Sequence, residues 1–201
     1  MGRAPRIEIP GGFYHVHTRG NGRQAIYFGN WSGKLFVREL DRTSRRHGWR
    51  ILAYCLMPNH YHLVLQIGES GLSDGMCELN GRFSRTSNWV NKRSNHLFGS
   101  RFTSHLIENE RYLLAACRYV LLNPVRKYGN DPRRWRWSSM RATLGLDLAP
   151  ACLDADWLVS QFGRNPAYAR KEFREFVDAG RAIRLVSGTD PDWEALAADR
   201  G

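Results

Sequence analysis

The sequence of 201 residues lacks several features that would assign it to a familiar class of protein. It has no apolar run near the roughly 18 residues needed to cross a bilayer, and no charged leader followed by an apolar segment. Its four cysteines are widely spaced and form no Cys-x-x-Cys pair, which argues against a disulfide framework or a cysteine zinc site. These absences favour a cytoplasmic protein with reduced cysteines.

Acidic residues are also few relative to basic ones. Asp and Glu total 19 against 30 Lys and Arg, which gives a formal net charge of +11 and an isoelectric point near 10.0. Such a chain attracts polyanions, so nucleic acid is the expected partner, although a basic surface kept for solubility has the same composition. The length suits one domain, or one domain with a small appendage.

Hydrophobic periodicity predicts the order strand, helix, strand, strand, helix, strand. The strands are expected over residues 13–18, 50–57, 60–67 and 101–107, and the helices over residues 34–46 and from 72 to 90. This order is typical of an α+β, ferredoxin-like antiparallel sheet, with helices on one face. A further helix should open at Asn109 or Glu110 and end or kink at Pro124.

The composition of the sequence changes after Pro132. A short helix capped by Asp156 is expected, followed by a helix that starts at Asn165-Pro166 and runs to Asp178. We therefore expect a main domain over residues 1–140 and a C-terminal helical extension over residues 141–201.

A histidine pair stands at the start of the third predicted strand. His60 and His62 share one face because strand side chains alternate, while the other face carries apolar residues that should pack on helices. Neutral imidazoles in this position can bind a divalent cation. His15 and His17 on the first strand have the same spacing, so spacing alone does not choose between the two pairs.

A tyrosine and an asparagine one helical turn apart could complete such a site. Tyr119 and Asn123 share one face of the last predicted helix, where they offer a nucleophile and a hard oxygen ligand. Two imidazoles with oxygen donors suit Mg²⁺ or Mn²⁺, and Zn²⁺ is also compatible. These metal ligands and this nucleophile suffice to cleave a phosphodiester bond. Tyr112 is a rival nucleophile that lacks an amide partner one turn later.

Several motifs carry a resemblance to a known family. In chain order they are Tyr14-His15-Val16, Arg19-Gly20-Asn21, the run from Ala53 to Leu63, Gly99-Ser100-Arg101-Phe102, the run from Arg118 to Val125, and Trp137-Ser138-Ser139. With them the chain resembles the single-tyrosine HUH transposases, and within these the REP-associated tyrosine transposases. The similarity covers roughly residues 10–140.

The resemblance implies an HUH nuclease fold in which His60, His62 and Asn123 hold the cation and Tyr119 attacks single-stranded DNA. It thereby favours His60/His62 over His15/His17. The implied reaction leaves a 5′-phosphotyrosine link and a 3′-hydroxyl, which is later rejoined to another strand. Stem-loop DNA from palindromic repeats, the REP elements, is the implied substrate. One departure is Tyr61, where a bulky apolar residue is usual in this family.

DNA recognition is less well defined by the sequence. Trp135 and Trp137 offer stacking surfaces for unpaired bases. The expected phosphate contacts are Arg19, Asn21, Arg23, Arg82, Arg85, Lys92, Arg93 and Arg101.

The resemblance thus implies a metal-dependent enzyme of DNA transposition and recombination, bacterial, cytoplasmic and nucleoid-associated. We expect a monomer or homodimer without a membrane or small-molecule partner. Two alternatives stay open. One is a domesticated, non-cleaving regulator that binds repeat DNA or RNA, and the other is a metal phosphoesterase that uses water.

Overall fold

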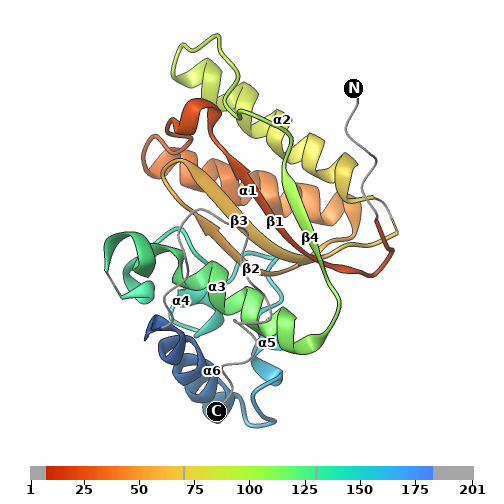
Figure 1. Cartoon of the computed structure of the whole chain (residues 1–201), viewed down its shortest axis with the longest axis vertical. Helices are drawn as coiled ribbons and strands as arrows, with labels where there is room; N and C mark the ends of the chain where they lie inside the picture. The colour runs from red at the N-terminus through yellow and green to blue at the C-terminus, as the bar shows by residue number, and fades with distance from the viewer. Residues whose placement is uncertain (1–7, 70, 130, 183–201) are drawn as a thin grey trace.

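The structure is a computed structural model that describes residues 8–69, 71–129 and 131–182. At its centre lies an antiparallel sheet with the strand order β2-β3-β1-β4 (Figure 1). The strands are β1 (Phe13–Arg19), β2 (Arg50–Leu56), β3 (His60–Gln66) and β4 (Thr103–Ile107). Helices α1 (Asn30–His47) and α2 (Leu72–Val90) make the two crossovers. The predicted α+β, ferredoxin-like fold class is confirmed.

The two faces of the sheet contribute to two separate cores. On one face, Tyr61 and Leu63 of β3 pack with Phe36 of α1 and Phe83 of α2. The Tyr61 hydroxyl donates to Asn80 Oδ1 of α2 at 2.5 Å, so the unusual tyrosine between the paired histidines is accommodated on this packed side.

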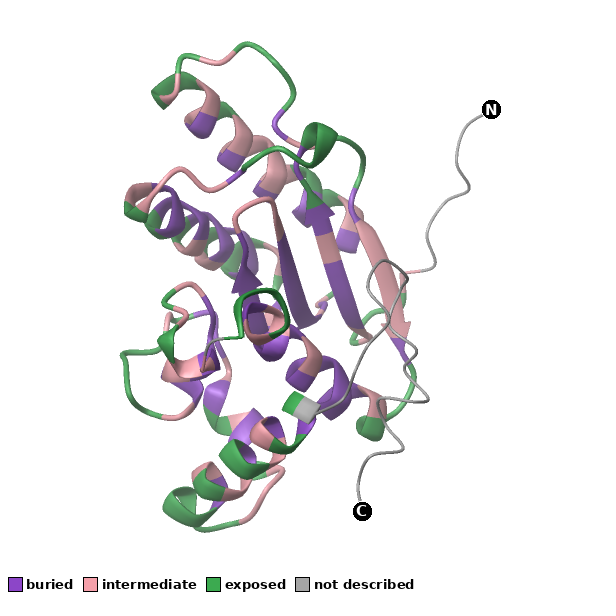
Figure 2. Cartoon of the chain, turned by 60° about the vertical axis from the view of Figure 1, so that its left-hand side comes forward, coloured by how far each residue is buried: buried purple, intermediate pink, exposed green. Residues whose placement is uncertain are grey.

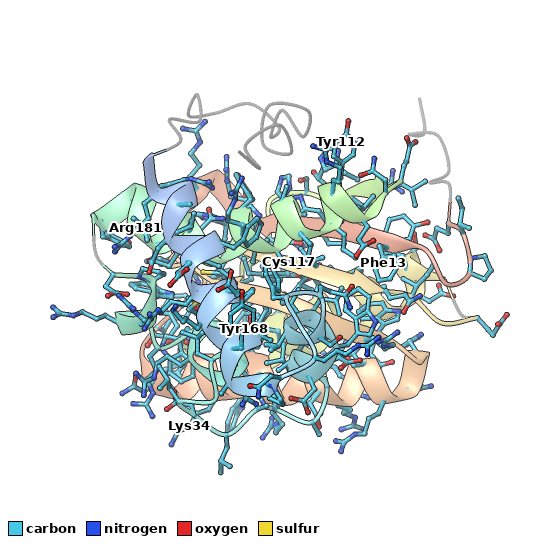
Figure 3. The ribbon with its side chains drawn as sticks, turned by 90° about the horizontal axis from the view of Figure 1, so that it is seen from below. Phe13, Lys34, Tyr112, Cys117, Tyr168 and Arg181 are labelled. Carbon is cyan, nitrogen blue, oxygen red and sulfur yellow. The ribbon has the colours of Figure 1, made fainter. Side chains whose placement is uncertain are left out.

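Helix α3 (Glu110–Tyr128) covers the opposite face, where the sequence predicted none. Val64 of β3 packs there with Val120 and Leu121. Figure 3 shows α3 and α1 on opposite sides of the sheet. The reason is the composition of α3, whose buried residues run almost without interruption from 113 to 122 and need a second apolar surface.

Pro124 does not end α3, which continues to Tyr128 and stops at Gly129. Gly129 has φ 67°, a left-handed conformation that glycine adopts without steric cost. Because proline has no N–H, the carbonyl of Val120 loses its normal helical donor. The side chain of Asn123 compensates in part, since its Nδ2 lies 3.0 Å from the Tyr119 carbonyl oxygen and 3.5 Å from that of Val120.

The C-terminal helices are α4 (Met140–Thr143), α5 (Ala155–Ser160) and α6 (Pro166–Ala179). Asn165 caps α6 as predicted, but Asp154 rather than Asp156 caps α5. Short 3-10 turns cover Asn21–Arg23, Pro132–Arg134 and Gly180–Ala182. The outer side of α6 is exposed (Figure 2).

The chain after α3 also closes the free edge of β2. The Leu56 N–H donates to the Trp137 carbonyl at 2.8 Å, and the Ile51 N–H donates to the Cys152 carbonyl at 3.1 Å. Pairing of this kind protects a sheet edge from association with other chains. The division into residues 1–140 and 141–201 stays a prediction, and residues 1–7 and 183–201 lie outside the described part. None of the described helices is long and apolar enough to cross a bilayer.

Candidate metal centre and nucleophile

Five of the seven histidines lie on the face of the sheet that α3 covers. The β1–β3 register pairs His17 with His62 and Arg19 with His60, and the β1–β4 register pairs His15 with His105. Cross-strand partners point to the same side of a sheet, and residues two apart on a strand do so as well. The sheet therefore gathers the two histidine pairs of the sequence, with His105, into one cluster.

His60 is held by amide side chains on two sides. Its Nδ1 lies 2.8 Å from Asn59 Oδ1, so Nδ1 carries the hydrogen and Nε2 keeps its lone pair. The side chain of Asn123 lies against the same imidazole and, by favouring its protonated form, offsets part of the lowering of the His60 pKa by burial. Since Asn123 Nδ2 donates to the Tyr119 carbonyl, Oδ1 is the atom that Asn123 can offer to a cation.

His62 is buried and has a partner in the neighbouring strand. Its Nδ1 lies 3.0 Å from Nε2 of His15. The rings of His60 and His62 are nearly perpendicular, at 88°, with centroids 5.1 Å apart. A metal-binding imidazole usually has its second nitrogen held by such a hydrogen bond, which fixes the ring.

Both histidines are neutral at physiological pH. Burial, aided by the positive charges of Arg19 and Lys127, lowers the pKa of His60 to about 4. Burial also holds the pKa of His62 well below its ordinary value. A neutral imidazole is the form that binds a metal ion. The donor set of His60, His62 and Asn123 thus fits a divalent cation.

Tyr119 is half-buried and lies over this cluster. Its ring stands edge-on to those of His15 and His62, with centroid distances of 5.7 and 5.6 Å. The Arg126 guanidinium lies 4.5 Å from the centre of the tyrosine ring. Tyr112 is two turns earlier on α3, which the rise of an α-helix converts to about 10 Å along the helix axis. These contacts favour Tyr119 over Tyr112 as the candidate nucleophile.

The sequence did not identify His105. Nitrogen ligand atoms of His15, His17 and His105 all lie within 4.8 Å of one another. Strand alternation predicts which β4 residues share a face with His105. It does not predict that β4 pairs with β1, and this pairing is what brings His105 beside His15. The described residues therefore contain two candidate ligand sets that meet at His15 and His62.

The predicted DNA-contact residues occupy different environments. Arg19 is exposed and pairs with His60 at the end of the sheet, while Arg82 forms an ion pair of 2.9 Å with Glu78 within α2. Arg85 and Arg101 line a cavity of about 580 Å³ between α2 and the loop that follows it. The remaining four are on the turn after β1 or the loop after α2, namely Asn21, Arg23, Lys92 and Arg93.

The tryptophans proposed for stacking are half-buried, and each is hydrogen-bonded within the protein. Nε1 of Trp135 donates to the Leu56 carbonyl at 2.9 Å, and Nε1 of Trp137 donates to the Tyr27 hydroxyl at 2.6 Å. Trp89, which the sequence analysis did not select, is 82% exposed near the end of α2. Trp89 is therefore a further candidate stacking surface, beside the basic loop that follows α2.

An antiparallel sheet that presents paired histidines to a tyrosine on a covering helix defines an HUH-type nuclease fold. The family model described as "Transposase IS200 like" matches residues 11–128, more than half of the chain, and the chain belongs to this family. Family membership implies a DNA-cleaving enzyme.

Two relatives agree with this assignment. The chain is 24% identical over 143 residues to a Haemophilus influenzae protein provisionally named a REP-associated tyrosine transposase, covering 65% of this chain and 76% of that one. It also resembles the solved structure of a REP-associated tyrosine transposase bound to a REP hairpin. That match has a TM-score of 0.61 and 20% identity, covers 76% of this chain and 90% of the other, and shows the shared fold.

Proposed function

We propose that this transposase cleaves and rejoins single-stranded regions of hairpin DNA through a covalent 5′-phosphotyrosine at Tyr119. His60, His62 and Asn123 would hold the divalent cation, Mg²⁺ or Mn²⁺, that the reaction requires. The observation that carries the proposal is the position of the Tyr119 ring, edge-on to His62 and on the same helix face as Asn123, which contacts His60.

Each side chain has a defined task in this proposal. The bound cation would polarise an oxygen of the scissile phosphate. The Tyr119 oxygen attacks phosphorus and loses its proton, the bond from phosphorus to the 3′-oxygen breaks, and that oxygen takes up a proton. In the reverse step a 3′-hydroxyl attacks and Tyr119 leaves. The guanidinium of Arg126, 4.5 Å from the centre of the Tyr119 ring, stabilises negative charge on the Tyr119 oxygen when that oxygen leaves in the reverse step.

The net charge and the structural relative both support a substrate class. The relative of known structure was solved with a REP hairpin, and the net charge of +11 favours a polyanion. Arg19 is the cross-strand partner of His60, which supports a contact between Arg19 and the phosphate next to the cleaved bond. We assign stem-loop DNA with single-stranded flanks as the substrate, handled in the bacterial cytoplasm at the nucleoid.

The experiment uses a pool of 3′-labelled hairpin oligonucleotides with randomised single-stranded flanks. A 5′-phosphotyrosine leaves the 3′-labelled fragment on the protein, so a labelled band at protein size should survive SDS when Mn²⁺ is present. EDTA and Tyr119→Phe should each abolish the band, and Tyr112→Phe should retain it. An adduct with Tyr119→Phe would contradict the proposal. Cleavage without an adduct would instead indicate a phosphoesterase that uses water.

A further inference from the structure

Three imidazoles from two neighbouring strands converge on the sheet beside the set assigned to catalysis. His15 and His105 are direct partners in the β1–β4 register, and His17 is two residues further along β1 on the same face. One ligand nitrogen from each ring lies within 4.8 Å of the other two. We propose that His15, His17 and His105 form a second cation site, one that selects a zinc-type ion.

The donor set and its burial suit zinc. Tetrahedral zinc with Zn–N bonds of about 2.0–2.1 Å places its nitrogen ligands about 3.3 Å apart, which small side-chain rotations can reach from the present arrangement. Three nitrogen donors without an oxygen favour zinc or cobalt over magnesium, which prefers oxygen. His15 is buried while His17 and His105 are half-buried, so an ion can enter past them and keep a water as its fourth ligand.

The second site differs from the first in its chemistry. The set of His60, His62 and Asn123 includes an amide oxygen and so accommodates a harder ion, whereas the second set offers imidazole only. The second set also joins β4, an edge strand that pairs with β1 alone, to its neighbour. An ion there would stabilise the attachment of β4 to the sheet.

The two sites meet at one hydrogen bond, between Nε2 of His15 and Nδ1 of His62, 3.0 Å apart. A neutral imidazole carries hydrogen on only one of its nitrogens. If His62 donates in this bond, its Nε2 can bind an ion, but His15 then carries its own hydrogen on Nδ1. If His15 donates, its Nδ1 can bind an ion, but the hydrogen of His62 is on Nε2. Ions at these two outer nitrogens therefore require opposite tautomers.

Zinc at the second site should consequently weaken ion binding at the first. The same result follows if His15 binds zinc through Nε2, because the hydrogen bond that orients His62 is then lost. This antagonism rests on the proposed role of His62 in catalysis. The second site itself does not.

The first test measures zinc binding by the full-length, metal-stripped protein without DNA, in competition with a chromogenic chelator. Absorption of Co²⁺ bound in place of zinc reports a tetrahedral nitrogen site. We expect one tight zinc per chain, with affinity reduced about tenfold or more by His105→Ala and by the bulkier His105→Gln. His60→Ala and the loop variant His96→Ala should bind zinc normally. Circular dichroism of the metal-free variants shows whether they are folded.

Unchanged zinc affinity in folded His105→Ala or His105→Gln would overturn the second site, as would zinc binding that is lost in His60→Ala and kept in the His105 variants. The second test follows Mn²⁺ binding by electron paramagnetic resonance. One equivalent of zinc should weaken Mn²⁺ binding about tenfold or more in the wild type and clearly less in His105→Ala, where only direct competition for the first set remains. Equal Mn²⁺ affinity with and without zinc in the wild type would overturn the antagonism. These binding readouts are independent of the adduct assay for Tyr119.

Discussion

His15 and His62, 47 residues apart in the chain, are joined across β1 and β3 by a hydrogen bond of 3.0 Å between Nε2 and Nδ1. Both side chains are buried beneath α3. The bond holds the ring of His62, and when His62 donates in it, its Nε2 is the nitrogen free to bind the proposed catalytic cation. His15 is therefore a positioning residue for the proposed reaction.

Removing this partner should weaken the first cation site without removing a ligand from it. We expect His15→Ala to lower Mn²⁺ affinity by about 10–100-fold, the usual effect of losing the group that orients a ligating histidine. Electron paramagnetic resonance of Mn²⁺ in zinc-free buffer measures this affinity. His96→Ala, on the loop after α2, is the control. Wild-type Mn²⁺ affinity in folded His15→Ala would show that His62 is not positioned by this bond.

Asn123 has two separable contributions, an oxygen offered to the cation and an amide group that donates to the Tyr119 carbonyl at 3.0 Å. Asn123→Ala removes both and should weaken Mn²⁺ binding about tenfold or more, whereas Asn123→Asp keeps a ligand oxygen and should bind at least as tightly as the wild type. Isothermal titration calorimetry distinguishes the two variants. Equal weakening in both would assign Asn123 to helix stabilisation alone.

Acid should destabilise the metal-free protein. The pKa of His60 is lowered to about 4, and burial holds the pKa values of His15 and His62 well below 6.5. On unfolding these imidazoles regain ordinary values and bind protons, so between pH 6.5 and 4 the unfolded state binds more protons than the folded state. Stability therefore falls as pH falls through this window, with uptake of about three protons near pH 5 from these histidines.

Urea unfolding in EDTA at several pH values checks this prediction. The free energy of unfolding should decrease steeply below about pH 6.5 in the wild type, and less steeply in His60→Ala, which has lost one of the groups. His96→Ala should follow the wild-type slope. A stability that does not change between neutral pH and pH 5 would contradict the buried, neutral state of the cluster.

Trp89 is expected to stack on an unpaired base. It is 82% exposed, so Trp89→Ala should change the free energy of unfolding by less than about 0.5 kcal/mol. The same change should weaken hairpin binding about tenfold, since stacking contributes roughly 1–3 kcal/mol per base. Leu148→Ala, at another exposed apolar residue, is the matched control in a fluorescence anisotropy titration. Equal binding by both variants would exclude Trp89 from the DNA interface.

Local periodicity was sufficient to predict the order of the elements and the shared face of His60 and His62. Strand alternation and turn residues are encoded over a few positions, which explains this success. The position of α3 was not predictable in the same way. Its apolar residues show that the helix must pack against another surface, but they do not show which face of the sheet it packs on. His105 was missed for a related reason. Its place in the cluster depends on the pairing of β4 with β1, which joins segments far apart in the chain.

The continuation of α3 through Pro124 could not be predicted from local sequence rules either. Proline usually ends a helix, but here Pro124 is buried among the residues of α3, and the Asn123 side chain donates to the carbonyls near it. The same hydrogen bond directs the oxygen of Asn123 away from the helix. A feature that sequence rules treat as a helix end therefore contributes to the candidate cation site.

Peptide mapping of the covalent protein–DNA adduct by tandem mass spectrometry tests the central claim most directly. The adduct is formed with Mn²⁺, the DNA is digested to a short remnant, and the modified peptide is sequenced. We predict a nucleotide attached through a phosphodiester to the side chain of Tyr119. A nucleotide on Tyr112 or on any other residue, or no modified peptide although the hairpin has been cleaved, would contradict the account.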